Sequence, residues 1–239
     1  DQNNFYVPTT DKNLNETLSV SGKKSISLPL GEVKITRKVN TLDIIIRSCS
    51  SVNMLTQSKK RIFEQDKIEY TLRSINSILR SVNYAKEHHP NIDIKITVVD
   101  HNLTNENLKK IKNLLNSSSV ESNLLNLDIS EFENKIKKIN EINEKTIPNQ
   151  ISNMSNIYKS FMLSKSFKDL IYFVEDDYIH ELNSFNEMLF TYERIASLTG
   201  NELIICPTDY PYLYVHTEST NVYLGEKYEQ HKNNLYYGK

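Results

Sequence analysis

Short runs of apolar, β-favouring residues recur along the chain between polar and helix-like stretches. They occupy residues 42–46, 94–99, 170–174 and 203–206, with 124–129 as a further candidate. Runs without polar alternation suit strands that are covered on both faces, as in the parallel sheet of an α/β protein. We therefore predict strands at these positions, and we expect the 170–174 strand to be buried on both faces.

Between these runs, apolar residues recur at the spacing of an α-helix. This pattern predicts helices at residues 65–87, 105–115, 132–142, 149–167 and 184–198. The side chains expected to point inward from the 149–167 helix are Ile151, Met154, Ile157, Tyr158, Phe161 and Met162. Alternation of strands and helices predicts a three-layer, Rossmann-like α/β fold with a mostly parallel central sheet.

Residues 1–40 differ from the rest of the chain, because they are polar and carry few large apolar side chains. Two alternating stretches, 25–28 and 33–36, flank a turn-forming sequence and predict an N-terminal hairpin or arm. The core is expected to begin at residue 41. Because the chain starts with Asp1 rather than Met, we expect it to be part of a larger multidomain protein.

Composition excludes several classes of protein. A chain of 239 residues with 38% hydrophobic and 25% charged residues is globular, and its net charge of −1 gives no reason to expect nucleic-acid binding. No apolar stretch is long enough to predict a membrane span. Cys49 and Cys206 each close a predicted strand, so we expect buried free thiols in a reducing compartment. The expected location is the cytoplasm, at most peripheral to a membrane.

The 170–174 run ends in three consecutive acids, Glu175, Asp176 and Asp177. Neighbouring carboxylates repel one another and lose hydration near a core. Mg²⁺ or Mn²⁺ would relieve this repulsion, because both cations prefer oxygen ligands. A solvated acidic turn before a helix that begins near Ser184 explains the same triplet. Both interpretations remain open from the triplet alone.

Two other predicted strands also end in charged residues. Arg47 follows the 42–46 run, and Asp100 follows the 94–99 run. In an open parallel sheet, the carboxyl ends of the strands lie along one edge, and ligands bind in the crevice beside it. We therefore expect Arg47, Asp100 and the acidic triplet to meet at this edge.

With these motifs in order, the chain resembles the GT-A glycosyltransferases, especially the large inverting family 2. The resemblance covers roughly residues 41–214. It consists of the first strand and helix, the strand that ends in Asp100, the Asn-bearing helix with Asn153 and Asn156, and the acidic triplet in place of an Asp-x-Asp motif. It implies a GT-A domain over residues 41–239 that has diverged, or is truncated, at its C-terminal end.

The resemblance also implies roles for individual residues. Asp177 would hold a Mn²⁺ or Mg²⁺ ion against the diphosphate of a nucleotide-sugar donor, and Glu175 and Asp176 would bind ribose, sugar or the metal shell. Asp100 would accept a hydrogen bond from the base, which favours uridine. Arg47 would pair with phosphate, or with one of the acids. Asn153 and Asn156 would donate to phosphate or sugar, or form a polar helix face.

The catalytic base is expected beyond the acidic triplet, because an inverting transferase must deprotonate the acceptor hydroxyl. Asp209 follows the predicted 203–206 strand and is the favoured candidate. Glu218, Glu226, Glu229 or an acid beyond Lys239 are the alternatives. The expected partners are a nucleotide-sugar donor and a saccharide, lipid-linked or protein acceptor.

Three other classes of protein share some of these features. A sugar-phosphate nucleotidyltransferase would need a glycine-rich phosphate loop after the first strand, whereas residues 48–51 contain no glycine. A glycoside hydrolase places two carboxylates on opposite sides of a bond, which consecutive acids do not. A non-catalytic domain that binds nucleotide sugars or carbohydrates remains the principal alternative.

Overall fold

The computed structural model describes residues 9–10, 25–26, 34–51, 65–132, 134–136 and 148–207. Contacts divide the chain into two compact units, one formed by Asp1–Arg37 with Tyr192–Lys239 and the other by Lys38–Thr191. The unit Lys38–Thr191 contains an open, all-parallel sheet with helices on its faces. The α/β class predicted from the sequence is therefore confirmed for this unit.

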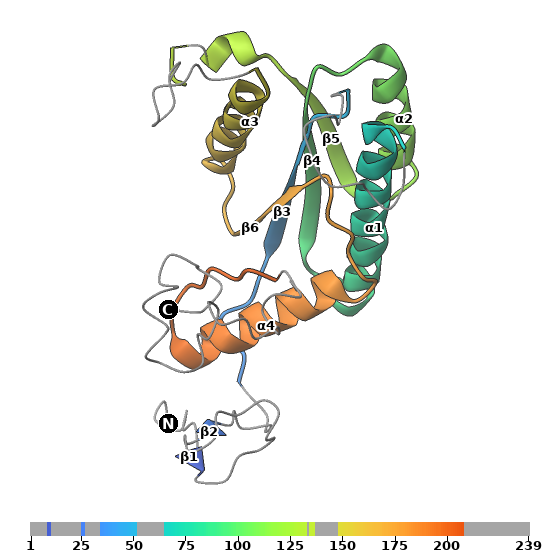
Figure 1. Ribbon diagram of the computed structural model, residues 1–239. Coiled ribbons are helices and arrows are strands. Elements are labelled where there is room, and N and C mark those ends of the chain that lie inside the picture. The colour runs from blue at the N-terminus through green and yellow to red at the C-terminus, as the bar shows by residue number, and fades with distance from the viewer. Residues whose placement is uncertain are drawn as a thin grey trace. The chain divides into compact units, whose positions relative to one another are not determined.

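The sheet of this unit consists of four strands in the order β5-β4-β3-β6 (Figure 1). Their bounds are Thr41–Ser48 for β3, Asp93–His101 for β4, Glu121–Leu127 for β5 and Leu170–Glu175 for β6. The central strands β3 and β4 are rich in Ile and Val, and Ile44, Ile45, Ile46, Val98 and Val99 are almost completely buried. These β-branched side chains pack well on a pleated surface that is covered on both sides.

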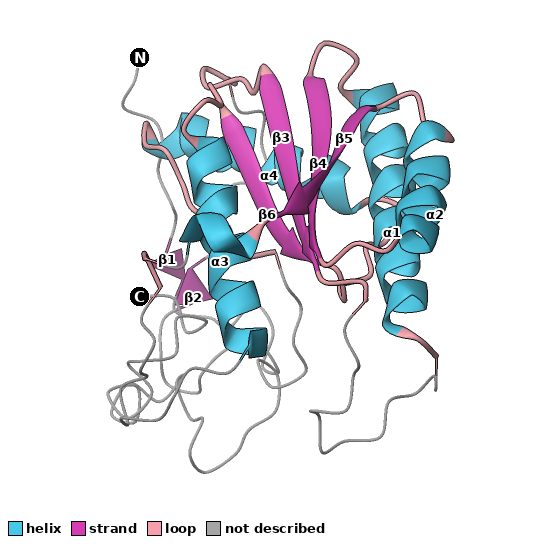
Figure 2. Cartoon of the chain, turned by 90° about the horizontal axis from the view of Figure 1, so that it is seen from above, coloured by secondary structure: helices cyan, strands magenta, loops and turns pink. Residues whose placement is uncertain are grey.

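Helices cover the two faces of the sheet (Figure 2). Helices α1 (Lys67–His88) and α2 (Asn105–Asn116) lie on one face, and α3 (Pro148–Ser164) lies on the other. Helix α4 spans Ser184–Thr199, and a short 3₁₀ helix, η1, spans Ile129–Phe132. Under α3, the sheet contributes Ile45, Val99 and Leu127 to a cluster with Phe132 and Ile136.

The N-terminal and C-terminal segments form the other unit. Strand β1 (Thr9–Thr10) pairs antiparallel with β2 (Ser25–Ile26), and residues 34–36 form no strand, so the hairpin partner predicted for β2 at 33–36 is not observed there. Within this unit, Arg37 Nε donates to Glu202 Oε1 at 2.7 Å. Hydrogen bonds from Arg37 and Tyr192 lower the pKa of Glu202 to about 2.

Two predictions of secondary structure and one prediction of burial differ from the structure within the described residues. Residues 203–206 form no strand, and Ile204 is fully exposed. Cys206 is consequently exposed rather than buried, whereas Cys49 is half-buried. Residues 134–136 form a turn and bend rather than part of the helix predicted at 132–142, and residues 133 and 137–142 lie outside the described residues. A short apolar run has no intrinsic strand stability, since a strand needs a neighbour to bond its backbone.

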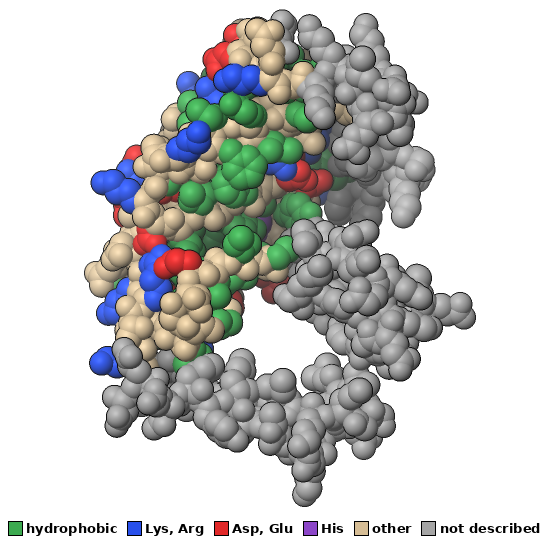
Figure 3. Space-filling view, turned by 90° about the vertical axis from the view of Figure 1, so that its left-hand side faces the viewer, with side chains coloured by type: hydrophobic (Ala, Val, Ile, Leu, Met, Phe, Trp, Pro, Cys, Tyr) green, Lys and Arg blue, Asp and Glu red, His purple; other side chains and the backbone are tan. Residues whose placement is uncertain are grey.

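The side of α3 that faces the sheet agrees with the prediction only in part, since Ile151 and Tyr158 pack against the core cluster as predicted. Ser152, Ser155, Asn156 and Ser160 are buried, whereas Met154, Phe161 and Met162 are exposed. Phe173 of β6 is likewise 39% exposed, so β6 is not buried on both faces as predicted. Phe161 and Phe173 are in ring contact, with centroids 5.2 Å apart, and hydrophobic side chains gather on this side of the unit (Figure 3). The side of α3 toward the sheet therefore combines small polar side chains with Ile151, Tyr158 and Leu163, while Met154, Phe161 and Met162 lie outside.

None of the described helices is long and apolar enough to span a bilayer.

Candidate functional site

The site lies at the carboxyl edge of the sheet, between β3 and β6. From β3, the chain adds β4 and β5 on one side and then returns to add β6 on the other, while the connecting helices change face. Such a reversal of strand order opens a crevice at the carboxyl ends of the two diverging strands, where α/β proteins bind ligands. Ser48 pairs in register with Asp100, and Arg47 with Glu175, so these strand ends are level. The predicted convergence of Arg47, Asp100 and the acidic triplet on one edge is observed.

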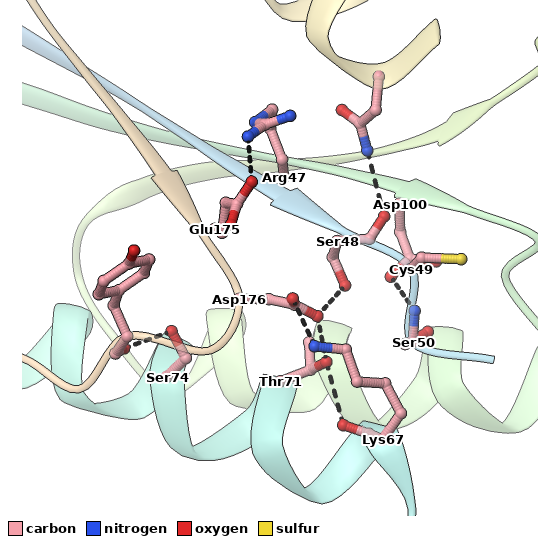
Figure 4. A network of polar contacts seen from close by, with 12 residues as sticks. Arg47, Ser48, Cys49, Ser50, Lys67, Thr71, Ser74, Asp100, Glu175 and Asp176 are labelled. Carbon is pink, nitrogen blue, oxygen red and sulfur yellow. Dashed lines mark hydrogen bonds and ion pairs between the residues drawn. The ribbon is translucent and has the colours of Figure 1, made fainter. Parts of the chain in front are cut away.

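Consecutive acids in the triplet contact opposite faces of the sheet, because side chains alternate along a strand. Glu175 lies on the side of α3, where it forms an ion pair with Arg47 of the adjacent β3 (Figure 4). Arg47 Nη1 also donates to Asn153 Oδ1 of α3 at 3.1 Å. The guanidinium therefore neutralises Glu175, and the side chain of Glu175 remains 47% exposed.

Asp176 lies on the side of α1 and is 5% exposed. Its carboxylate accepts hydrogen bonds from Lys67 Nζ at 2.7 Å, Thr71 Oγ1 at 2.6 Å and Ser48 Oγ at 2.8 Å (Figure 4). A buried carboxylate requires this kind of compensation by charge and hydrogen bonds. Asp176 is thus engaged inside the protein. Asp177 follows the end of β6 and is exposed to solvent.

The carboxyl group of Asp100 is fully buried and only partly satisfied. Oδ2 accepts a hydrogen bond from the backbone N–H of Ser50 at 3.0 Å, whereas Oδ1 has no partner. Burial raises the pKa of Asp100 above its ordinary value, because a charge is poorly solvated there. Asn107 of α2 holds the same loop by donating to Ser51 Oγ at 3.1 Å. Asp100 carries a cost in stability that its own contacts do not offset.

Asn156 has a structural role in this arrangement. Its amide nitrogen donates to the backbone oxygens of Ser48, at 3.1 Å, and Val99, at 2.9 Å. These carbonyls belong to the ends of β3 and β4, so the amide bridges the two central strands at the edge. Donation to a ligand, as the resemblance implied, would require these bonds to break. Asn153, one turn earlier, is exposed and contacts Arg47 instead.

Several residues of the edge were not identified from the sequence. Lys67 and Thr71 lie on one face of α1 because they are four residues apart. This spacing was the signal in the sequence that could have identified them. On the side of α3, His101 Nδ1 hydrogen-bonds with Ser152 Oγ at 2.7 Å, and Cys49 Sγ lies 4.0 Å from the same nitrogen. Burial raises the pKa of the Cys49 thiol, which therefore stays protonated at neutral pH.

The backbone after His101 is also unusual, since Asn102 has a φ of 62°. Asparagine tolerates this left-handed conformation better than most residues. The turn directs the chain from the end of β4 into α2.

The described residues contain no group of three or more His, Cys, Asp or Glu side chains that could hold a metal ion. Arg47 and Lys67 offset part of the repulsion within the triplet by pairing with Glu175 and Asp176. A cation that arrives with a diphosphate needs only one or two protein carboxylates, and the exposed Asp177 fits that requirement. Asp209, Glu218, Glu226 and Glu229 lie outside the described residues.

No protein-family model, curated protein or solved structure matches this chain. The observed class is therefore that of the fold, an α/β protein with a parallel sheet whose strand order reverses beside an acidic edge.

Proposed function

We propose that this chain is a glycosyltransferase of the GT-A type, which transfers a sugar from a nucleotide-sugar donor to an acceptor hydroxyl. The observation that carries the proposal is the position of the acidic triplet at the point of reversed strand order, level with the incompletely bonded Asp100. A protein gains nothing in stability from an acid such as Asp100. A binding role accounts for its presence there.

We assign Asp100 to binding of the nucleobase of the donor. The free Oδ1 would accept a hydrogen bond from a ring N–H, which uracil presents and which would satisfy the unpaired oxygen. Because Asp100 is fully buried, the side chains around it must move before a base can reach it. The preferred donor is accordingly a uridine diphosphate sugar.

The diphosphate is assigned to the exposed end of the triplet. When bound, a Mn²⁺ or Mg²⁺ ion between Asp177 and the diphosphate would stabilise the negative charge of the leaving group. Arg47 is close enough to the edge to contribute positive charge, provided that it leaves Glu175. Asp209 remains the proposed base, and a saccharide, lipid-linked or protein hydroxyl remains the proposed acceptor.

A non-catalytic domain that binds nucleotide sugars is the second candidate. It is favoured by the ion pairs of Glu175 and Asp176, which leave Asp177 as the exposed acid of the triplet. Binding without turnover requires no more than that. The two candidates differ in whether the glycosidic bond of the donor is broken.

The test is release of UDP from a panel of UDP-sugars with Mn²⁺, with and without candidate acceptors. We expect release from at least one donor, and an Asp177→Asn variant should lower the rate at least about a hundredfold. Asp93→Asn is the matched control, because Asp93 is an exposed acid at the amino end of β4. Donor binding without release would support the non-catalytic domain, and absence of binding would refute both candidates.

A further inference from the structure

Helix α1 carries a row of hydroxyl groups that bond to the segment after β6. Thr71, Ser74, Ser77 and Ser81 recur at helical spacing, and Thr71, Ser74 and Ser81 are fully buried. Thr71 bonds to the carboxylate of Asp176, and the other three bond to backbone groups further along. This row differs from the apolar stripe of the same helix, which packs on the sheet.

The backbone groups concerned lie in an irregular stretch, between the end of β6 and the first turn of α4. Ser74 Oγ donates to the carbonyl oxygen of Tyr178 at 2.7 Å, and Ser77 Oγ accepts from the N–H of His180 at 3.0 Å. Ser81 Oγ accepts from the N–H of Phe185 at 3.1 Å. Backbone groups outside regular structure need such partners when they are removed from water, so the hydroxyl row determines the path of this segment.

The row ends at the N-terminus of α1 with the ion pair of Lys67 and Asp176. Both side chains are nearly buried, at 10% and 8% exposure. Removal of one partner would leave the other charge buried and uncompensated, which is strongly unfavourable. Ser48 connects the same carboxylate to β3, so Asp176 joins the segment to both the helix and the sheet.

Asp177 lies between two residues that α1 holds in place. Asp176 is held through its side chain and Tyr178 through its backbone carbonyl, while Asp177 itself is exposed. We propose that Lys67 and Asp176 are positioning residues, which hold the backbone at Asp177 so that this carboxylate is presented to a ligand in one orientation. This assigns Asp176 a role different from the ligand-binding one implied by the resemblance. The part that concerns a ligand rests on the proposed function; the part that concerns the segment does not.

Preorganisation is the physical benefit of this arrangement. A binding group that is ordered before the ligand arrives loses less conformational entropy on binding. At the far end, His180 Nε2 hydrogen-bonds with the Tyr172 hydroxyl at 2.9 Å, and the His180 ring stacks on Phe185 at 5.5 Å. The segment is thus held at both ends and at its middle.

The first test is amide hydrogen exchange on the whole chain, which requires no ligand. In a Lys67→Met variant, exchange at the amides of residues 177–185 should accelerate about tenfold or more. Lys67→Arg should restore most of the protection. Lys110→Met is the matched control, because Lys110 pairs with Glu106 on the surface of α2 at 2.8 Å and should leave the segment unchanged. Unchanged exchange in Lys67→Met would overturn the proposal.

If Lys67→Met does not fold, Ser77→Ala provides a milder version of the same test. This change removes the acceptor of the His180 N–H, and exchange there should accelerate about fivefold with little effect on the sheet. Equal exchange at His180 in this variant and in the native chain would overturn the proposal.

The second test separates positioning from direct ligand contact by measuring affinity for UDP with Mn²⁺. Lys67→Met should weaken binding about tenfold, and adding Asp176→Asn should recover most of the loss, because the uncompensated charge is then absent. Direct contact of Asp176 with the ligand would give a different result: the double variant and Asp176→Asn would bind UDP equally weakly, and both more weakly than Lys67→Met. That result would show that the proposal is wrong. If the native chain binds no nucleotide, the proposed function fails, while the exchange experiment still decides the positioning role.

Discussion

At the scale of single residues, the carboxyl edge contains two buried carboxylates that differ in their hydrogen bonds. Both oxygens of one have partners, and one oxygen of the other has none. Asp176 and Asp100 are both buried, but Asp176 has a lysine and two hydroxyl donors. Asp100 accepts from the backbone N–H of Ser50 and lies near the Ser48 and Ser50 hydroxyls, while its Oδ1 has no hydrogen-bond partner. The same residue type is therefore compensated at one position and only partly compensated at the other. This difference leads to opposite expectations for removing their charges.

Asp100→Asn should stabilise the protein at neutral pH. The folded-state pKa of Asp100 is raised, so its ionisation opposes folding above that pKa and has no effect below the ordinary value of 3.8. We expect the variant to gain on the order of 1 kcal/mol in unfolding free energy at pH 7. Urea unfolding at pH 7 and pH 4 measures this, and the gain should shrink at the lower pH. A loss of stability at pH 7 would contradict the expectation.

His180 should have the opposite effect from Asp100, because it lowers the stability of the protein as pH falls rather than as pH rises. Burial lowers its pKa from 6.5, so the unfolded chain takes up a proton that the folded protein does not. Stability should therefore fall as pH drops below 6.5 towards the folded-state pKa, by up to about 1.4 kcal/mol per pH unit. In His180→Gln, the slope of unfolding free energy between pH 7 and pH 5 should be smaller. Identical slopes would show that His180 is not responsible.

At the scale of elements, α3 buries several polar side chains and exposes several large apolar ones. Its buried face is formed by serines and Asn156, while Met154, Phe161 and Met162 are exposed. Ile151, Tyr158 and Leu163 pack against the core cluster, but apolar burial alone does not explain why the serines and Asn156 face the sheet. The explanation is hydrogen bonding, since the Asn156 amide is the group that bonds to the ends of β3 and β4.

Asn156→Ala should consequently destabilise the protein more than its small volume suggests. Two buried backbone carbonyls would each lose a donor, and the expected loss in unfolding free energy is about 2–4 kcal/mol. Asn153→Ala is the control on the same helix, because Asn153 is exposed and should cost less than about 1 kcal/mol. Chemical denaturation of both variants decides the matter. Equal effects would show that the orientation of α3 does not depend on Asn156.

At the scale of the whole molecule, strand order determines which groups meet. The strands β3 and β6 are neighbours although α1, β4, α2, β5, η1 and α3 separate them in the chain. Their pairing brings Arg47 to Glu175 and Ser48 to Asp176, and it places α1 beside the segment after β6. The ion pairs that result offset the charges of Glu175 and Asp176, whereas Asp177 is exposed to solvent.

Binding of a divalent cation should accordingly depend on nucleotide. We expect calorimetry to detect no measurable binding of Mn²⁺ to the protein alone, and binding once UDP is present, because the phosphates supply the missing ligands. Asp177→Asn should weaken the nucleotide-dependent binding about tenfold or more, and Asp93→Asn should not. Tight Mn²⁺ binding without nucleotide would refute this expectation and would require a metal cage that involves residues outside the described parts of the chain.

The sequence alone determined the α/β class, the position of most elements and the presence of acids at strand ends. Periodicity is a local property, and the runs at 42–46 and 94–99 and the helix at 65–87 therefore agree closely with β3, β4 and α1. The apolar run at 203–206 was misleading for the same reason, because it has the composition of a strand but no strand beside it among the described residues.

Only the tertiary structure decided which side of each element is buried and which charges are paired. Lys67 and Asp176 are 109 residues apart, so no local pattern indicates that they form an ion pair. The face of α3 that contacts the sheet depends on two backbone carbonyls from other strands, which no helical periodicity contains. Hydrophobic periodicity reflects the average preference of a side chain for burial. Hydrogen bonds and ion pairs instead depend on the positions of particular atoms. Strand order and register determine those positions.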